Sequence, residues 1–580
     1  MTSAHDTSAD PEIIRLTEDR DWDGVADVVV VGTGVAGCTA AINCADLGSD
    51  VIMLEKSDAP GGTSAKSGGG MMIPNNSYQR ASGLIESKSD FIGFLARVGR
   101  PLIFDPTDPT FGLPQWEYDL IEAYYEHAGD ALAHMEELGA LKVLHIPDWP
   151  SYNDVREDKM SRGRYVVPRD DDGQMSNGRN AIDRMMAKLS ELGVKVRVDF
   201  RVDGLYVNES GEVVGARGLE GGTHRSIRAL HAVVFASGGF THSRPLVSEY
   251  LNGQIVGGCA AVTNTGDFLP IAKSLGLPLH QMNEAFWAPV VYEQALDADP
   301  ALIANFNCAG DSVLVVNKYG IRVANEKVTY HDRTRSHFLW DPKKAEYPNF
   351  LQFVVMDQSC RERYGYDGFI DLTAGNFIPR SGESSKYFLQ GETLDELAAQ
   401  FAERLRKTAS GRGGVELSAD FADTLRASID RFNTFARQGT DEDFGRGETA
   451  IEQFFMALDD QFRPTLEGEE ANPDAGSNRT LAPLASSGPY YGIILAPGAL
   501  DTKGGPKVNS RLQVLDGDEV PVPGLYGIGN CVASASGQAY WSAGCTWGPY
   551  LTFGYVAARS IVQEPIKRVG APQVAASSRS

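Results

Sequence analysis

Two hydrogen-bond donors stand four residues apart near the C-terminus of the sequence: the Tyr540 hydroxyl and the backbone N–H of Gly544. Two donors aimed at one point can polarise a carbonyl oxygen, as an oxyanion hole does. Polarisation of a ketone makes the adjacent C–H bond acidic, so hydrogen can be removed beside it. The spacing therefore favours chemistry at a ketone, provided that another part of the chain holds an acceptor for hydrogen.

A glycine-rich motif near the N-terminus predicts where such an acceptor binds. The β-branched run 27–31 is typical of a buried parallel strand, and the sequence Gly-Thr-Gly-Val-Ala-Gly at 32–37 follows it directly. Helical sequence leads to a second strand that ends in Glu55. The three glycines allow a tight turn, approach of a pyrophosphate and close helix packing, while the carboxylate can accept hydrogen bonds from ribose. The pattern predicts a dinucleotide site.

The loop beyond the second strand, residues 56–70, is rich in glycine and hydroxyl side chains. Its backbone N–H groups can reach a second part of an extended cofactor. We therefore expect this loop to belong to the same site.

Length, charge and cysteine spacing restrict the class of protein. With 580 residues, two large domains are expected. The net charge of −24 argues against nucleic acid and against docking on anionic lipid. The seven cysteines show no C-x-x-C pair and no zinc spacing, so no metal site is expected. Free thiols, with neither a signal peptide nor an apolar run long enough to cross a membrane, predict a cytoplasmic protein.

Several segments, in order along the chain, resemble the fumarate reductase and succinate dehydrogenase flavoprotein superfamily. Residues 61–70 are similar to its G-G-x-S-x-x-S-G-G element, and 199–202 to the strand that meets adenine. Residues 232–240 are similar to its A-x-G-G-F element, and 264–267 open the next helix. Residues 523–530 resemble G-L-Y-A-A-G-[EN], whose last residue holds the ribityl chain. The resemblance implies FAD as the cofactor.

The resemblance also implies how FAD is held and how electrons leave. Covalent members carry a histidine where this sequence has Gly62, so FAD is expected to bind non-covalently. A second G-x-G-x-x-G motif between strands is missing, which indicates an external acceptor, such as a quinone or a carrier protein, rather than NAD(P)H. The residues implied to bind FAD are Gly32, Gly34, Ala36, Gly37, Glu55, Lys56, Gly62, Thr63, Ser64, Ser67, Gly68, Gly69, Val202, Ala236, Ser237, Gly238, Asp267, Asn530, Thr546, Gly548 and Leu551.

Within this superfamily the sequence departs from the dicarboxylate reductases. Those proteins use an arginine a few residues after an Asn-Glu pair and a histidine before a C-terminal Gly-Gly pair. This chain has Tyr330 at the first place and no histidine in 497–505. It resembles instead the 3-ketosteroid dehydrogenases, in which a tyrosine after Asn-Glu, a P-G-D-L-G-T-x-G-G turn and Y-x-G-x-G-x-T-x-G-P-x-x-T-F-G-Y recur. The last run is matched by residues 540–555.

That resemblance implies a role for each catalytic residue. Tyr540 and Gly544 would hold the ketone oxygen, Tyr330 would remove the α-proton, and the flavin would accept hydride. A tyrosine with a pKa of about 10 is a poor base unless its phenolate is stabilised. The candidate neighbours for that purpose are His331, Arg333 and Arg335.

Three differences separate the sequence from the Δ1-dehydrogenase pattern. Trp149 stands where that pattern has a further tyrosine that assists the base, and Tyr152 follows three residues later. Ser542 replaces the first glycine of Y-x-G-x-G, as in the Δ4-(5α)-dehydrogenase branch, and is a further catalytic candidate. Gly-Ala-Leu-Asp-Thr replaces Gly-Asp-Leu-Gly-Thr before Gly504. The position of the new double bond therefore stays open.

The expected fold is α/β: a Rossmann-like FAD-binding domain with an inserted α+β substrate domain and the active site between them. The FAD-binding domain is expected at residues 24–285 and 485–566, the inserted domain at 286–484, and flexible tails at 1–23 and 567–580.

The expected activity is FAD-dependent introduction of a C=C bond next to the ketone of an apolar ring substrate, by Δ1-dehydrogenation of a 3-ketosteroid in steroid degradation. The alternatives are a Δ4-(5α)-type dehydrogenase, a flavin ene-reductase acting on an activated alkene, and a non-catalytic flavin carrier or sensor. The oligomeric state is open.

Overall fold

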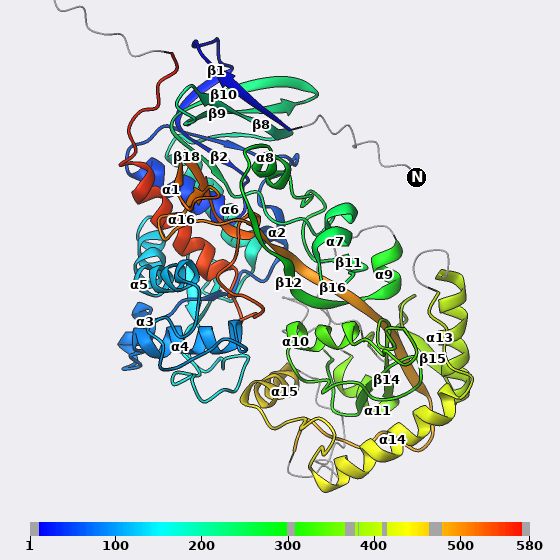
Figure 1. Ribbon diagram of the computed structural model, residues 1–580. Coiled ribbons are helices and arrows are strands. Elements are labelled where there is room, and N and C mark those ends of the chain that lie inside the picture. Colours follow the sequence, from blue (N-terminus) through cyan, green and yellow to red (C-terminus); the bar gives the residue numbers. More distant parts are fainter. Residues whose placement is uncertain are drawn as a thin grey trace, which may run out of the picture.

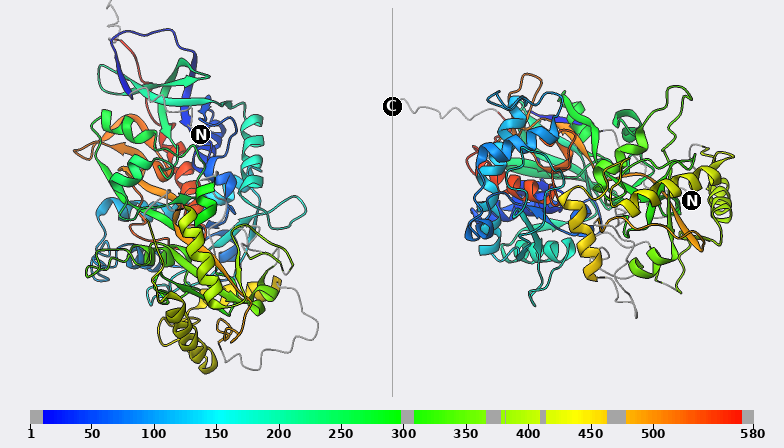
Figure 2. Two further views of the ribbon diagram at one scale, coloured as in Figure 1. Left: turned by 90° about the vertical axis from the view of Figure 1, so that its right-hand side faces the viewer. Right: turned by 90° about the horizontal axis from the view of Figure 1, so that it is seen from below.

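The computed structural model describes residues 11–297, 308–365, 378–380, 382–408, 414–462 and 478–570. These residues form two lobes (Figure 1). Segments from both ends of the chain, coloured blue to teal and red, build the first lobe, and most of the green to yellow segments build the second. The views in Figure 2 show the same division. The described residues include no helix that could span a membrane.

A nine-stranded sheet forms the centre of the first lobe. Its strands are Glu12–Leu16 (β1), Gly24–Val31 (β2), Val51–Leu54 (β3), Lys195–Arg197 (β7), Phe200–Asn208 (β8), Val213–Glu220 (β9), Thr223–Phe235 (β10), Gln513–Leu515 (β17) and Pro521–Gly527 (β18). The order is β1-β8-β9-β10-β2-β3-β7, and β18 joins β10 to β17. β2 runs parallel to β3 and β10, as a dinucleotide-binding unit requires.

Helices from both ends of the chain pack together in this lobe. Val35–Asp46 (α1) contacts Trp547–Ile561 (α16), which also contacts Gln115–Glu137 (α5). A Cβ at Gly554 would lie 2.8 Å from the Thr39 Cβ, so this glycine lets α16 approach α1 closely. The other helices are Gly62–Lys66 (α2), Ser77–Ala81 (α3), Lys88–Gly99 (α4), Gly178–Glu191 (α6), Arg244–Tyr250 (α7) and Phe268–Ser274 (α8). A small sheet consists of Met71–Met72 (β4), Val143–His145 (β5) and Tyr165–Pro168 (β6).

Two long antiparallel strands, Leu279–Val291 (β12) and Tyr490–Pro506 (β16), run from the first lobe into the second (Figure 1). The other strands of their sheet are Gly257–Gly258 (β11), Val313–Val316 (β13), Gln352–Asp357 (β14) and Leu389–Gly391 (β15). The helices here are Tyr292–Asp297 (α9), Tyr330–Arg335 (α10), Gln358–Tyr364 (α11), Leu394–Thr408 (α13), Phe421–Gln438 (α14) and Ala450–Phe462 (α15). Short 3-10 turns are formed by Ser336–Phe338 and Gly529–Cys531. Phe353 on β14 packs against Phe401 and Phe421 of the covering helices.

Continuous strands connect the two lobes near the places where the sequence predicted domain boundaries. β12 crosses the boundary expected between 285 and 286, and residues 497–505, which resemble a turn element, lie inside β16. The ladder between the two strands fixes the relative position of the lobes, because shifting it would break its hydrogen bonds.

Parts of both expected tails belong to the first lobe. Residues Glu12–Leu16 form β1, which pairs in parallel with β8. At the other end, the Lys567 side chain is buried, and the backbone N–H of Lys567 donates to the Leu230 carbonyl at 2.7 Å. A strand of five residues is too short to show a clear alternation of apolar and polar residues in the sequence. Its strand conformation depends on pairing with β8. Residues 1–10 and 571–580 of the expected tails lie outside the described residues.

Candidate active site

One large cavity is lined by residues from both lobes. The first lobe contributes the glycine turn after β2, the loop 62–70, and the turns at 236–238 and 528–530. The second lobe contributes Tyr330 at the start of α10 and Phe455 of α15. The dinucleotide motif and both predicted catalytic tyrosines therefore share one space.

The turn after β2 fits the pyrophosphate of a dinucleotide. Gly32 has φ of 104°, and a Cβ there would lie 2.4 Å from the Ala236 carbonyl oxygen. Gly34 is the N-cap of α1 and lines the cavity without a side chain. A Cβ at Gly37 would lie 2.1 Å from the Gly32 carbonyl oxygen, so this residue packs the helix on the turn. The positive end of α1 thus opens toward the space where phosphates would bind.

Glu55 stands at the end of β3 and lines the cavity. Its carboxylate accepts hydrogen bonds from the backbone N–H of Thr33 at 3.1 Å and of Ser57 at 2.9 Å. The next residue, Lys56, pairs with Asp267 at 2.8 Å, at the start of α8. These bonds hold an acidic group beside the glycine turn, where ribose hydroxyls can donate to it.

Hydroxyl groups of the glycine-rich loop tie it to the neighbouring helices. The Ser64 Oγ accepts from the Val35 N–H at 3.0 Å, at the start of α1. The Ser67 Oγ accepts from the Trp547 Nε1–H at 2.9 Å, at the start of α16. The loop therefore closes the cavity between two helix N-termini.

Most of the residues that the sequence assigns to FAD line this cavity. They are Gly32, Gly34, Ala36, Glu55, Lys56, Gly62, Thr63, Ser64, Ser67, Gly68, Gly69, Val202, Ala236, Ser237, Gly238, Asp267, Asn530 and Thr546. Gly37, Gly548 and Leu551 lie outside the lining. A Cβ at Gly548 would meet the Met72 carbonyl oxygen at 2.1 Å, and Leu551 is fully buried, so both pack α16 against its neighbours.

Three tyrosines meet on the cavity wall. The rings of Tyr330 and Tyr540 cross edge to face with centroids 5.4 Å apart. Tyr152 stacks on Tyr540 at 5.8 Å and meets Tyr330 edge-on at 5.9 Å. Ser542, the fourth catalytic candidate, is buried but does not line the cavity. The sequence left the role of Tyr152 open, and the fold brings it against both predicted catalytic tyrosines.

Burial controls the protonation of these phenols. It raises the pKa of Tyr330 and of Tyr540 well above the usual value for tyrosine. The neighbouring Tyr540 raises the pKa of Tyr330 further, whereas a hydrogen bond from Tyr152 acts in the opposite direction. Tyr540 is thereby kept as a hydrogen-bond donor. The Tyr152 hydrogen bond is a contact that favours the phenolate of Tyr330 over its phenol.

Gly544 presents its backbone to the same cavity. Its φ of 77° lies in the left-handed region, and a Cβ would lie 2.5 Å from the Met71 backbone. Among the described residues, no acceptor takes its N–H. This N–H can therefore serve as a second donor beside the Tyr540 hydroxyl, and no larger residue fits here.

Cationic and imidazole groups hold the backbone that precedes Tyr540. The Gln538 carbonyl accepts from the His331 Nε2–H at 2.9 Å and from Arg335 at 2.5 Å, and the Ala539 carbonyl accepts from Lys503 at 2.9 Å. The His331 Nδ1 accepts from the Trp287 N–H, and burial lowers the pKa of His331 well below its usual value.

The three residues that the sequence offered as phenolate neighbours therefore have other partners. Arg335 also pairs with Glu284 at 3.0 Å, and Arg333 donates to the Glu326 carbonyl at 2.7 Å. None of His331, Arg333 and Arg335 lines the cavity. His331 and Arg335 support the segment before Tyr540.

Lys503→Met is expected to change how stability depends on pH. Burial lowers the pKa of Lys503 to about 7, whereas a lysine in the unfolded chain keeps its proton up to about pH 10.4. Between these values the unfolded chain binds the extra proton, so this group makes the free energy of unfolding rise with pH by up to about 1.4 kcal/mol per unit. Denaturant unfolding above pH 7 measures this slope.

The slope should be lost in Lys503→Met and kept in Lys507→Met, which removes a half-buried lysine whose partner, Glu519, is largely exposed. Equal slopes in wild type and Lys503→Met would show that the buried amine does not titrate in this range.

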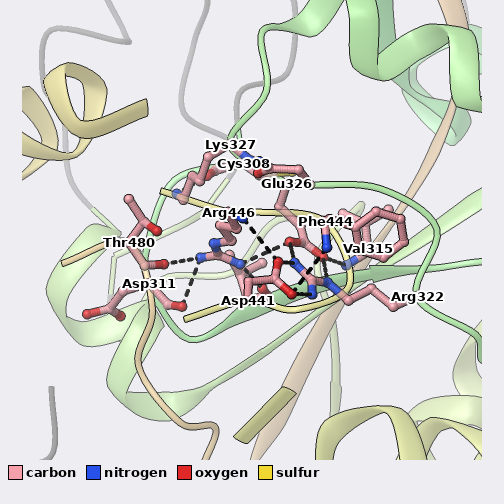
Figure 3. A network of polar contacts seen from close by, with 12 residues as sticks. Cys308, Asp311, Val315, Arg322, Glu326, Lys327, Asp441, Phe444, Arg446 and Thr480 are labelled. Carbon is pink, nitrogen blue, oxygen red and sulfur yellow. Dashed lines mark hydrogen bonds and ion pairs between the residues drawn. The ribbon is translucent and has the colours of Figure 1, made fainter. Parts of the chain in front are cut away.

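A buried ion network holds the segment that leads to Tyr330 (Figure 3). The Glu326 carboxylate accepts from Arg322 at 2.7 Å and from Arg446 at 3.1 Å. Asp441 pairs with Arg322 at 2.8 Å on the other side. The side chains of Glu326 and Arg446 have no exposed surface. The glutamate of the Asn-Glu element, Glu326, therefore stabilises the fold.

Glu326→Gln should destabilise the protein by about 3–5 kcal/mol, because it leaves two buried arginines short of negative charge. Denaturant unfolding followed by fluorescence measures the change. Asp423→Asn is the control: its side chain is 85 % exposed and pairs with Arg426, so a change within about 0.5 kcal/mol is expected. Equal stability of the two variants would contradict the assigned role of the network.

The cavity also contains residues that the sequence did not identify. Phe286 of β12 meets Tyr540 edge-on at 5.5 Å, and Phe455 of α15 packs on both Trp149 and Tyr152. They belong to no motif, and the fold brings them to the cavity from β12 and α15. Asp501 also lines the cavity. The sequence could have indicated it, because an aspartate stands there in place of the glycine of the ketosteroid dehydrogenase pattern.

The described residues contain no group of His, Cys, Asp and Glu side chains that could hold a metal ion. All seven cysteines are described, free and buried. Burial raises the pKa of Cys545, beside the tyrosines in sequence, to about 12. These thiols are protonated at neutral pH.

The glycine turn, the acidic strand end and the hydroxyl-rich loop around one cavity define a dinucleotide-binding flavoprotein. The chain belongs to the FAD binding domain family, whose model matches residues 27–546.

Similar proteins include dehydrogenases of ring ketones. The 4-oxocyclohexanecarboxylate 2-dehydrogenase of Sinomonas cyclohexanicum is 28% identical, over 92% of each chain. The 3-oxosteroid 1-dehydrogenase of Mycolicibacterium smegmatis is also 28% identical, over 92% of this chain and 97% of its own. The fold resembles that of the 3-ketosteroid delta1-dehydrogenase from Sterolibacterium denitrificans in complex with 1,4-androstadiene-3,17-dione. That comparison has a TM-score of 0.74 and 24% identity, covering 93% of this chain and 99% of the other.

Proposed function

We propose that the protein is an FAD-dependent dehydrogenase that introduces a C=C bond next to the ketone of a 3-ketosteroid, at the Δ1 position. The observation that carries this proposal is the shared cavity: Tyr330, Tyr540 and Gly544 line the same space as the dinucleotide motif. The names of the similar dehydrogenases support the same chemistry.

The reaction divides between three groups of this chain and the cofactor. The Tyr540 hydroxyl and the Gly544 N–H donate to the ketone oxygen, which stabilises the negative charge that develops there. Tyr330 takes the proton from the carbon next to the carbonyl. Bound FAD supplies the acceptor for hydride from the following carbon.

Tyr152 is assigned as the positioning residue for Tyr330. Its hydrogen bond to Tyr330 lowers the pKa of the base against the effect of burial, so it stabilises the phenolate that proton removal requires. In the Δ1-dehydrogenase pattern a tyrosine at the position of Trp149 assists the base, and we assign that role to Tyr152 in this protein.

Aromatic side chains around the tyrosines favour an apolar polycyclic ketone over a small carboxylated ring. The ring centroid of Trp149 lies 4.4 Å from that of Tyr165 and 5.7 Å from that of Phe455. The Phe286 ring packs edge-on against Tyr540. Such a wall gains free energy by covering apolar surface. A Δ4-(5α)-type reaction would use the same clamp and is distinguished by its product.

FAD is proposed to bind non-covalently and to pass its electrons to an external quinone or carrier protein. Gly62 lines the cavity at the place where covalent members carry histidine, and no atom outside its neighbours lies within 4 Å of its Cβ position. Release of flavin from the acid-denatured protein tests the first point. The seven free cysteines fit a reducing, cytoplasmic location.

Anaerobic mixing of the FAD-loaded protein with ring ketones tests the activity. A saturated-ring 3-ketosteroid should bleach the flavin absorbance and yield a product that has lost two hydrogen atoms, and 4-oxocyclohexanecarboxylate should do so more slowly. NMR of the product separates Δ1 from Δ4 desaturation.

Bleaching by neither ketone, with turnover of an enone by the reduced flavin, would favour an ene-reductase. No reaction in either direction would favour a flavin carrier. Both results would overturn the proposal.

A further inference from the structure

Asp501 places a carboxylate in the cofactor cavity where the ketosteroid dehydrogenase pattern has glycine. It lies on β16, the strand that joins the two lobes. Its side chain is almost completely buried and lines the same cavity as Asn530. The cofactor motifs and the catalytic tyrosines do not account for this residue.

Hydrogen-bond donors surround both carboxylate oxygens. The Oδ1 accepts from the Thr241 hydroxyl at 2.7 Å and from the Thr502 N–H at 2.8 Å. The Oδ2 accepts from the Gly239 N–H at 3.1 Å, from Asn264 Nδ2 at 2.7 Å and from Asn530 Nδ2 at 2.8 Å. Because every partner donates, this arrangement suits the ionised carboxylate, which only accepts hydrogen bonds.

The negative charge has no cationic partner: among the described residues, no lysine, arginine or histidine forms an ion pair with Asp501. Burial raises the pKa of the carboxyl group, and the surrounding donors oppose that shift. A buried charge is screened less by solvent than a charge at the surface, so its effect reaches farther.

Asp501 is also linked to the residue expected to hold the ribityl chain. The Asn530 amide nitrogen donates to Asp501, and its amide oxygen accepts from the Tyr550 hydroxyl. These two bonds fix which way the amide faces. The charge is thereby held one hydrogen bond away from a residue that would contact FAD.

We propose that Asp501 is a positioning residue that orients Asn530 and holds a fixed negative charge beside the flavin, which lowers the reduction potential of bound FAD. This proposal rests on FAD binding at this cavity, as in the proposed function. Reduction adds negative charge to the flavin, and a nearby anion disfavours it. The reduced flavin would then pass its electrons more readily to an external acceptor.

The test measures the midpoint potential of the FAD-loaded protein against reference dyes, together with the Kd of FAD. Asp501→Asn keeps the side-chain volume and removes the charge, while Asp501→Gly restores the residue of the resembling pattern. Both should raise the potential by about 30 mV or more, equivalent to a tenfold change in the equilibrium of a two-electron couple. The control is Asp357→Asn, a buried carboxylate on β14 that accepts from Ser312 and Cys360 and does not line the cavity.

An unchanged potential in both FAD-loaded variants would overturn the proposal. Loss of FAD by both variants, with circular dichroism like that of wild type, would also overturn it in favour of a role in binding alone. Neither measurement uses a ketone, so a protein that binds FAD but oxidises no ketone would refute the proposed function and leave this test valid.

Discussion

Tyr330→Phe is expected to lower kcat for ketone oxidation about 10²–10⁴-fold, the usual contribution of a general base. The phenyl ring keeps the packing against Tyr152 and Tyr540, so KM should change little. Without the oxygen, no group at this position can take the α-proton. Stopped-flow bleaching of the flavin by a 3-ketosteroid measures the loss, because it follows the first half-reaction alone.

The matched control is Tyr526→Phe. Tyr526 is fully buried on β18, donates to Glu564 and does not line the cavity. It should keep the wild-type rate of bleaching. Bleaching by Tyr330→Phe at the control rate, with equal FAD content, would remove Tyr330 from the reaction.

Tyr540→Phe is expected to lower kcat about 10²–10³-fold, the cost of removing one donor from an oxyanion hole. The Gly544 N–H would remain as a single donor to the ketone oxygen. A substitution at Gly544 cannot test the second donor, because a Cβ there would collide with the Met71 backbone. Substitution of Tyr540 is therefore the direct way to weaken the clamp.

Ligand spectroscopy separates this effect from loss of the base. An enone bound to the clamp should absorb at longer wavelength than in water, because two donors polarise its carbonyl. The shift should shrink in Tyr540→Phe and persist in Tyr330→Phe. A full shift in Tyr540→Phe would mean that another group holds the ketone.

The cofactor half of the molecule could be predicted in detail, since its signals are local. The β-branched run 27–31 folds into β2, and the glycine turn leads into α1. Short-range geometry decides such a segment: Gly32 must adopt a positive φ, and Glu55 must end the neighbouring strand. The membership of the FAD binding domain family confirms this part of the prediction.

Other features depend on contacts between distant segments, and the sequence could not reveal them. The edge strand β1 exists through pairing with β8, far away in the chain. His331 and Arg335 were expected as neighbours of a phenolate, but in the fold their side chains donate to the Gln538 carbonyl. The sequence left the role of Tyr152 open, and only the fold brings its ring against those of Tyr330 and Tyr540.

The sequence by itself determined the cofactor, the class of fold and the four-residue spacing of Tyr540 and Gly544, because each is encoded in contiguous residues whose backbone geometry is local. The tertiary structure decided which tyrosine packs against Tyr330, what supports the backbone before Tyr540, and that a carboxylate at 501 enters the cavity. Asp501 and Lys503 both lie on β16, whose position is set by its pairing with β12, and register is a property of paired segments.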